Sequence, residues 1–256
     1  MRMDLNNKIF VSIIMPTYND MEFIGKSIDS VLNQTFRNFE LLVVDDCSTD
    51  ETKSYIEKRK NQDGRIKYLS NDKNSGAAVS RNLGVEVAQG ELIAFIDSDD
   101  VWFENKLEKQ IAFMMENNYL FTCTFYNKID TNDNDLDTII TFPFETNYND
   151  LLKNNCGNST VIYNAKKLGK FYIENIKKRN DYLMWLKVIK KSSKLYCLDE
   201  VLSSHRLRQG SISSNKLDLV KYHWKVYREY EKINIFYSLY LTLFWIKKTI
   251  LKRGKR

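Results

Sequence analysis

The sequence contains few of the residues that interrupt or cross-link a polypeptide. It has only two prolines, Pro16 and Pro143, so no proline-rich linker divides the chain. Its four cysteines lie far apart and form no C-x-x-C pair, which argues against a zinc site and a disulfide framework. Reduced, buried thiols in a cytosolic protein are therefore expected. No internal repeat is visible.

Long apolar segments are also absent. Residues 1–8 contain no apolar run, so no signal peptide is expected. The most apolar segment, residues 233–246, is shorter than the ~20 residues that span a bilayer, which argues against a transmembrane helix. The expected location is the cytoplasm.

The composition is that of a chain with a sizeable core. Apolar residues make up 43% and aromatic residues 13% of the 256 residues, which suits one large α/β domain with a tail, or two small domains. The net charge of +6 is uneven, because basic residues gather at the end: Lys247, Lys248, Lys252, Arg253, Lys255 and Arg256. Such a cluster suits an anionic surface, either membrane or nucleic acid.

One apolar run ends in a group of carboxylates. Residues 92–96 read Leu-Ile-Ala-Phe-Ile, as in a strand buried on both faces, and Asp97, Ser98, Asp99 and Asp100 follow. In an open α/β sheet, ligands bind beyond the carboxyl ends of the strands. Adjacent carboxylates repel unless a cation screens them, and hard oxygen ligands suit Mg²⁺ or Mn²⁺. The alternative is a polar turn in which Asp99 or Asp100 caps the next helix.

Two earlier apolar runs end at polar residues in a similar way. Residues 10–15 predict a strand that stops at Pro16-Thr17-Tyr18, because proline cannot serve a central ladder. Residues 39–44 predict a strand that stops at Asp45-Asp46, and residues 66–69 a further short strand.

Helical spacing of apolar residues predicts helices over residues 24–34, 51–60 and 77–88. Ser48 and Glu51 predict a capping box for the second of them. Strands that alternate with helices indicate a parallel sheet with right-handed crossovers, so the acidic strand ends should share one edge. No G-x-G-x-x-G follows the first strand, which disfavours a dehydrogenase-type dinucleotide fold.

The second half of the chain is less regular. It predicts a helix near residues 107–115, strands over 119–126 and 161–163, a polar loop over 130–137, and a helix that starts near residue 181. Residues 206–213 predict a basic loop, and residues 217–251 predict one long helix before the basic tail.

Four motifs occur in a characteristic order. They are Val-Ser-Ile-Ile-Met-Pro-Thr-Tyr-Asn (11–19), Val-Val-Asp-Asp-Cys-Ser-Thr-Asp (43–50), Asn-Ser-Gly-Ala-Ala-Val-Ser-Arg-Asn (74–82) and Phe-Ile-Asp-Ser-Asp-Asp (95–100). As a set they resemble the family 2 glycosyltransferases, which are inverting enzymes. The resemblance implies a GT-A type α/β fold: a Rossmann-like, mostly parallel central sheet flanked by helices, here with a C-terminal helical extension.

The same resemblance implies a UDP-sugar donor and a divalent metal, Mn²⁺ or Mg²⁺. Asp99 would be the metal ligand, and Asp46 would bind the uracil or ribose. The residues that the resemblance places at the donor are Pro16, Thr17, Tyr18, Asp46, Arg81, Asp97, Ser98, Arg206 and Arg208. On its spacing alone, Arg81 would be a solvated cation on a helix surface.

The resemblance also implies a catalytic base, and here the chain departs from the family. Relatives carry a Glu-Asp pair whose Asp is the base, whereas this chain reads Asn180-Asp181. Asp181 would be the base, or else a helix N-cap. Relatives often carry a His where this chain has Arg208, so the loop would contact phosphate through a guanidinium.

The expected reaction is transfer of a sugar from UDP to an acceptor hydroxyl with inversion, which gives a β-linkage. The setting implied is synthesis of O-antigen, capsule or lipopolysaccharide on a polyprenyl-diphosphate-linked acceptor. Residues 1–215 would form the catalytic domain, with a donor half (1–100) and an acceptor half (101–215), and residues 216–256 a basic helical extension. That extension would lie on the anionic inner membrane, or pack on the domain or in a homodimer.

Two other functions compete. A metal-dependent nucleotidyltransferase would also use acidic motifs, but it usually has a Gly-rich basic loop after the first strand, and this chain has Pro16-Thr17-Tyr18 there. A non-enzymatic basic module would leave the converging carboxylates unexplained. Those carboxylates would repel phosphate, so nucleic acid is not an expected partner.

Overall fold

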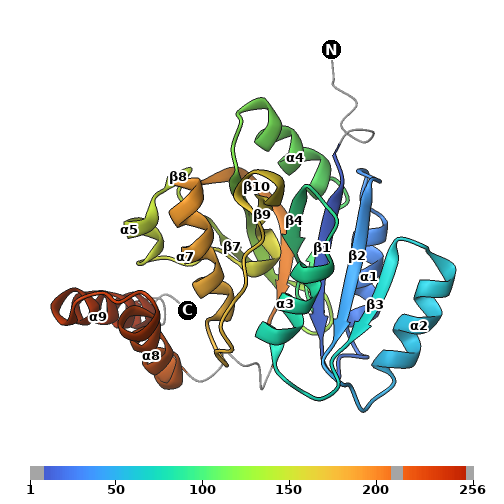
Figure 1. Ribbon diagram of the computed structural model, residues 1–256, viewed down its shortest axis with the longest axis horizontal. Helices are drawn as coiled ribbons and strands as arrows, with labels where there is room; N and C mark the ends of the chain where they lie inside the picture. Colours follow the sequence, from blue (N-terminus) through green and yellow to red (C-terminus); the bar gives the residue numbers. More distant parts are fainter. Residues whose placement is uncertain (1–8, 209–215, 252–256) are drawn as a thin grey trace.

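The computed structural model describes residues 9–208 and 216–251. One mixed sheet, with the strand order β3-β2-β1-β4-β9-β6-β10-β5, runs through the molecule and has helices on both faces (Figure 1). β7 pairs with β6 and β8 with β10 beside this path. The predicted α/β class with flanking helices is confirmed.

The first half consists of strands that alternate with helices, as predicted. In chain order the elements are β1 (Val11–Thr17), α1 (Ile24–Leu32), β2 (Phe39–Asp45), α2 (Thr52–Gln62), β3 (Ile66–Ser70), α3 (Ala77–Val87) and β4 (Leu92–Phe95). β1 pairs in parallel with β2 and β4, and β2 pairs in parallel with β3. The carboxyl ends of these strands therefore share one edge.

The central strands are buried on both faces, so their side chains belong to two hydrophobic cores, one on each face of the sheet. Ile14 and Leu42 pack with Val85 of α3 in one core, which continues into the helices of the second half. Ile13 and Leu41 point to the opposite face and pack in the second core with α1. The unbroken apolar runs of the sequence follow from this double burial.

The second half adds antiparallel strands to the sheet. Its elements are β5 (Val101–Trp102), α4 (Lys106–Glu116), β6 (Phe121–Ile129), β7 (Asp135–Ile140), β8 (Glu145–Thr146), α5 (Tyr148–Leu151), a 3₁₀ turn (Asn158–Thr160), β9 (Ile162–Asn164), α6 (Ala165–Leu168), α7 (Asn180–Ser192) and β10 (Leu195–Arg206). β9 is antiparallel to both β4 and β6, whereas β10 is parallel to β6. The first half is therefore all parallel, whereas the second half mixes antiparallel pairs with the parallel pair of β6 and β10.

Two local predictions were wrong. The polar segment 130–137 is not all loop, because Asp130 accepts bonds from Asn132 N and Asn134 N and closes a tight turn into β7. The capping box before α2 does not form either. Ser48 Oγ instead donates to Asp45 Oδ1, and the N-cap residue Glu51 makes no side-chain capping bond.

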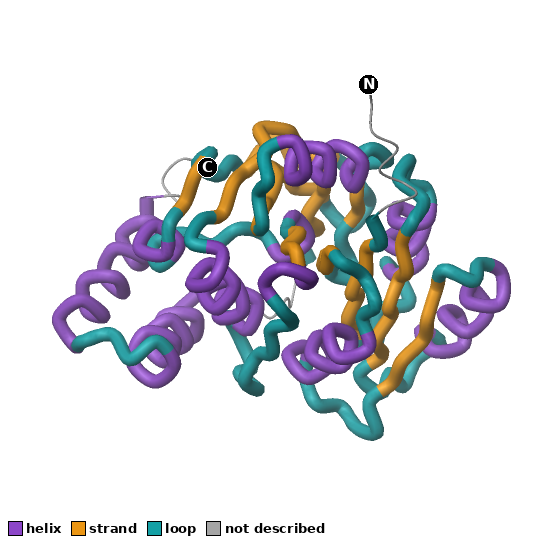
Figure 2. Tube along the Cα trace, turned by 45° about the horizontal axis from the view of Figure 1, so that its top comes forward, coloured by secondary structure: helices purple, strands orange, loops and turns teal. Residues whose placement is uncertain are grey.

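The C-terminal extension is two helices rather than one. α8 (Lys216–Lys225) continues into a π-helical turn (Val226–Tyr230), and α9 (Ile235–Leu251) follows. The helical conformation is interrupted at Lys232, whose φ of 57° is left-handed. Asn234 Oδ1 then accepts a hydrogen bond from Tyr237 N at the start of α9. In Figure 2 both helices lie at the end of the molecule opposite α2. Within the described residues no helix is long and apolar enough to cross a membrane.

Gly84 marks where α3 approaches the sheet most closely. A Cβ built there would lie 2.6 Å from Ile14 Cγ2, in the centre of a core. We expect Gly84→Ala to lower the free energy of unfolding by about 2 kcal/mol, because overpacking outweighs the gain in helix propensity. Gly64→Ala is the matched control, since a Cβ at Gly64 meets nothing within 4 Å. Urea denaturation of both variants tests this; equal midpoints would contradict the close approach.

Candidate active site at the carboxyl edge of the sheet

The ends of β1, β2 and β4 meet as the sequence predicted. Thr17 pairs in register with Asp45, and Asp46 N donates to Thr17 O at 2.9 Å. Ile96 N donates to Ile14 O at 3.1 Å, which places Asp97 just beyond the same edge. The prediction that the first strand stops at Pro16 was wrong, because the pairing of β1 with β4 ends at Ile14 and Pro16 has a strand neighbour only in β2, where it pairs with Val44. Pro16 and Thr17 are buried within β1, whereas the Tyr18 side chain is exposed beside them.

Asp46 shapes one wall of this edge. Its carboxylate accepts from Ser75 N at 2.9 Å, Gly76 N at 2.7 Å and Asn71 Nδ2 at 2.6 Å. Gly76 has a φ of 90°, a conformation that favours glycine, and α3 begins directly after it. Asp46 therefore holds the loop before α3 against the end of β2.

Arg81 is a buried link rather than the surface cation that its spacing suggested. It is 6% exposed; Nη2 donates to Asp97 Oδ1 at 2.7 Å and Nη1 donates to Asn180 Oδ1 at 2.6 Å. Asn158 Nδ2 also donates to Asp97 Oδ1, at 2.7 Å. Arg81 thus joins α3, the end of β4 and the start of α7. Burial raises the pKa of Asp97, and Arg81 counteracts this.

Asp99 is held by Arg208. Arg208 Nε lies 2.9 Å from Asp99 Oδ2, and Nη1 lies 2.6 Å from Oδ1 of Asp20, a buried residue. Ser98 Oγ donates to the other oxygen of Asp20 at 2.5 Å. Burial and the nearby Asp100 carboxylate raise the pKa of Asp99 to about 7, although Arg208 opposes this.

Asp100 and Arg206 tie the end of β10 to the edge of the sheet. Asp100 accepts from Ser159 Oγ, from Arg206 N at 3.1 Å and from the His205 ring, 3.2 Å away. The Arg206 guanidinium is buried and bonds to Asp99 O, Asp130 O and Asp133. The structure therefore does not bring the Arg206 side chain to the site beside Arg208.

Asp181 lies in the first turn of α7, facing the same region. The N-cap residue is Arg179, which makes no side-chain capping bond, so Asp181 is not the cap. Asp181 Oδ2 accepts from Asn155 Nδ2 at 3.2 Å. Its charge is close enough to help raise the pKa of Asp97, and that of Tyr126 to about 12, although burial is the larger cause of both shifts.

The donor set fits a divalent cation bound partly by substrate. No group of three or more His, Cys, Asp or Glu side chains in the described part of the chain forms a complete metal site. Mg²⁺ and Mn²⁺, however, are commonly held by one or two carboxylates together with substrate phosphates. Asp97 and Asp99, two carboxylates at the same edge, meet that requirement.

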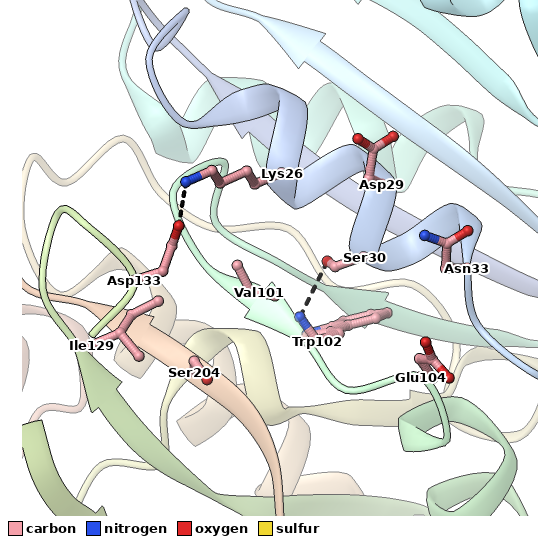
Figure 3. Close-up of a pocket in the computed structure, with 10 residues that line it drawn as sticks. All are labelled: Lys26, Asp29, Ser30, Asn33, Val101, Trp102, Glu104, Ile129, Asp133 and Ser204. Atoms are coloured by element: carbon pink, nitrogen blue, oxygen red, sulfur yellow. Dashed lines mark hydrogen bonds and ion pairs between the residues drawn. The ribbon is translucent and has the colours of Figure 1, made fainter. Parts of the chain in front are cut away.

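A separate cavity of about 460 Å³ lies between α1, β5 and the start of β7 (Figure 3). It is lined by Lys26, Asp29, Ser30, Asn33, Val101, Trp102, Glu104, Ile129, Asp133 and Ser204. None of the predicted donor or base residues is among them. We therefore place the candidate active site at the strand edge.

Sequence reasoning missed several residues of this edge. Asp20 is two residues beyond Tyr18, so its place after β1 was a usable signal. Asn155, Asn158 and Ser159 lie in a segment without a recognisable motif, and no local pattern marks them.

Comparison with known proteins gives this arrangement its class. The family model described as "Glycosyl transferase family 2" matches residues 12–171, and the chain belongs to that family. The sheet resembles that of S. aureus TarS 1–349 in complex with UDP-GlcNAc, with a TM-score of 0.71 and 22% identity over 93% of this chain and 72% of that one. The GT-A fold is thereby confirmed.

Two curated relatives match almost end to end. WfgD of Escherichia coli is 41% identical over 96% of this chain and 98% of its own length, and is named as a UDP-Glc:alpha-D-GlcNAc-diphosphoundecaprenol beta-1,3-glucosyltransferase. TuaG of Bacillus subtilis (strain 168) is 39% identical over 97% of this chain and 99% of its own length, and its name assigns it provisionally to teichuronic acid biosynthesis. The protein is thus a glycosyltransferase, and neither a nucleotidyltransferase nor a non-enzymatic module.

His205 should give the stability of the protein a pH dependence, whereas His223 should not above about pH 7. The Asp100 carboxylate raises the pKa of His205 to about 9, from an ordinary value near 6.5. His205 therefore stabilises the fold below about pH 6.5, and this contribution is lost as the pH rises through about 9. The loss of stability in His205→Gln should be largest near pH 6 and should vanish above about pH 9. It should be modest at every pH, because the His205 side chain is 43% exposed.

His223 provides the control. Its burial and the charge of Arg179 lower its pKa to about 2, so it stays neutral in the fold. The effect of His223→Gln should be constant from about pH 7 to 10, because His223 is then neutral in both the folded and unfolded states. Urea denaturation at several pH values measures both variants; a pH-independent effect of His205→Gln would contradict the ion pair.

Proposed function

We propose that the protein transfers a sugar from a UDP-sugar to a hydroxyl of a polyprenyl-diphosphate-linked acceptor with inversion, in the synthesis of a bacterial surface polysaccharide. The observation that carries this proposal is the meeting of Asp46, Asp97 and Asp99 at one strand edge, with Asp181 of α7 facing them. The activity printed for WfgD supports a UDP-linked donor and a lipid-diphosphate acceptor.

Unsatisfied polar atoms at the edge also favour a polar ligand there. Thr17 Oγ1, Arg81 Nε and Asn158 Oδ1 are buried and have no hydrogen-bond partner among the described residues. Buried polar groups rarely stay unpaired. We assign the nucleotide to this edge, with Tyr18 and Thr17 at the base and the Asp46-held loop as the wall.

Asp99 would hold Mn²⁺ or Mg²⁺. When bound, the cation neutralises the charge that builds on the departing diphosphate. Arg208 is the second cationic group within reach of that diphosphate, since its guanidinium already spans Asp20 and Asp99. Arg206 would act by positioning, since it ties the main chain of Asp99 to Asp130 and Asp133.

Asp181 would accept the proton of the attacking hydroxyl. Asn155 donates to one of its oxygens, which leaves the other oxygen for the acceptor. A single displacement assisted by one base inverts the anomeric centre, so an α-linked donor gives a β-linkage. General bases contribute roughly 10²–10⁴-fold to such steps.

The domain limits follow from these roles. Residues 1–100 would supply the donor half and residues 101–215 the acceptor half, with residues 216–256 as an extension. The deciding experiment is a screen of UDP-glucose, UDP-galactose and their N-acetyl forms with Mn²⁺, first for hydrolysis and then with lipid-diphosphate sugars as acceptors. Release of UDP from none of these donors would overturn the proposed donor class.

Replacement of the base should separate chemistry from binding. Asp181→Asn keeps the size of the side chain but cannot take a proton at neutral pH. We expect the turnover rate to fall by about 10²-fold or more while UDP affinity is retained. Steady-state transfer assays and UDP titration calorimetry measure the two quantities. Near-wild-type turnover in the Asn variant would place the base elsewhere.

Replacement of the metal ligand should remove the response to Mn²⁺. Asp99→Ala deletes the carboxylate but leaves the buried strand intact, so thermal stability should change little while Mn²⁺-dependent transfer is lost. Glu104→Gln is the control, because this exposed carboxylate lines the separate cavity. Mn²⁺ binding measured without donor gives a readout independent of turnover. Full activity of the wild type in EDTA would refute the metal role.

A further inference from the structure

The side of α9 that faces solvent is apolar. Phe236 is 83% exposed, Leu243 is 56% exposed and Ile250 is 63% exposed. Leu239 and Tyr240 are also exposed, and the spacing of three, four and seven residues puts all five on one stripe. We call Phe236, Leu239, Tyr240, Leu243 and Ile250 the outer face of α9. Large exposed apolar patches mark interaction sites.

The opposite side of α9 packs against the rest of the protein, so α9 already has a buried face and the outer face is a second, exposed one. Ser238, Leu241 and Thr242 are buried. The Trp245 ring lies 4.6 Å from the His223 ring of α8, and the Arg179 guanidinium lies 5.5 Å from the Trp245 ring. These contacts fix the rotation of α9 about its axis and keep the outer face turned outward.

The charges near this face favour an anionic membrane over a second copy of the chain as its binding partner. Lys247 is exposed on the same stripe, and further basic residues follow in the sequence up to Arg256. Residues 233–256 contain no Asp or Glu. A second copy of α9 would bring no carboxylate to neutralise these cations, whereas anionic lipid headgroups would. Aromatic rings with a polar tip, such as Tyr240, suit the membrane interface.

The outer face is connected to the candidate base through three consecutive residues. The Lys153 ammonium lies 5.9 Å from the Tyr240 ring, and Lys248 bonds to Asn154. Asn155 then bonds to Asp181. A surface docked on α9 would therefore lie next to the acceptor side of the active site. In Figure 1, α9 lies at the same end of the molecule as α5 and α7.

We propose that the outer face of α9 is a membrane-docking surface. Its apolar side chains enter the headgroup–acyl boundary of an anionic leaflet, and Lys247 contacts the headgroups. The helix lies in the membrane plane and does not cross it. The choice of a membrane rests in part on the proposed lipid-linked acceptor, which would be met at this surface, but docking needs neither donor nor acceptor.

The test is sedimentation of the full chain with vesicles, in the absence of donor and acceptor. Vesicles of phosphatidylcholine with phosphatidylglycerol should bind the protein at low salt, and pure phosphatidylcholine vesicles should bind it much less. Leu243→Glu and Phe236→Glu should each weaken binding at least about tenfold, because each puts a charge into the apolar boundary. Lys247→Glu should weaken it about fivefold or more and reduce its salt dependence.

Ile139→Glu is the matched control, because Ile139 is 59% exposed on β7, an element with no part in the outer face. It should bind vesicles like the wild type, and all variants should keep the UDP affinity of the wild type. Failure of the wild type to bind anionic vesicles at low salt would overturn the proposal, as would an equal loss in Ile139→Glu.

The oligomeric state tests the alternative binding partner, which is a second copy of this chain. A wild-type dimer that ignores vesicles and becomes monomeric on Leu243→Glu would assign the outer face to a second copy and overturn membrane docking. Vesicle binding without any sugar transfer would leave the docking surface in place and count against the proposed function instead.

Discussion

The repulsion among carboxylates at the edge of the sheet is the constraint on which the rest of the site depends. Asp97, Asp99 and Asp100 follow one another within four residues, and the charge of Asp100 helps to raise the pKa of both Asp97 and Asp99, although burial is the larger cause. Each is compensated by a different, distant segment: Asp97 by Arg81 of α3, Asp99 by Arg208 and Asp100 by the end of β10. The acidic edge thus draws the two halves of the chain together.

The negative charge of Asp99 is neutralised differently from those of Asp97 and Asp100, because its partner, Arg208, is one that a ligand can replace. Arg81 and Arg206 are buried, whereas the Arg208 side chain is 35% exposed and lies just after β10. A divalent cation on Asp99 would compete with the Arg208 guanidinium. The displaced guanidinium would then be free to pair with the diphosphate that such a cation accompanies. One arginine can therefore stabilise the edge before the donor binds and contact the donor afterwards.

The sequence predicted the parts of the molecule that local pattern determines. Apolar runs and turn residues predicted the first three βα units, their shared edge and the acidic strand ends. The family motifs predicted that the protein is a glycosyltransferase. Partners from distant segments could not be predicted. Ser48 bonds to Asp45 instead of capping α2, Arg206 turns inward, and the helix after residue 216 breaks at Lys232. Each outcome depends on a neighbour that only the fold supplies.

The departure at Asn180 shows how the edge is balanced. The family resemblance implies a Glu at position 180, and a carboxylate there would share the Arg81 guanidinium with Asp97. Asn180 is neutral and takes only one hydrogen bond from Arg81, at Nη1, so the positive charge is paired with a single carboxylate. Burial already favours the protonated form of Asp97, and undivided pairing with Arg81 opposes that tendency. Asn180 therefore leaves the Arg81 charge to Asp97 alone, while its amide still ties α3 to the helix that carries Asp181.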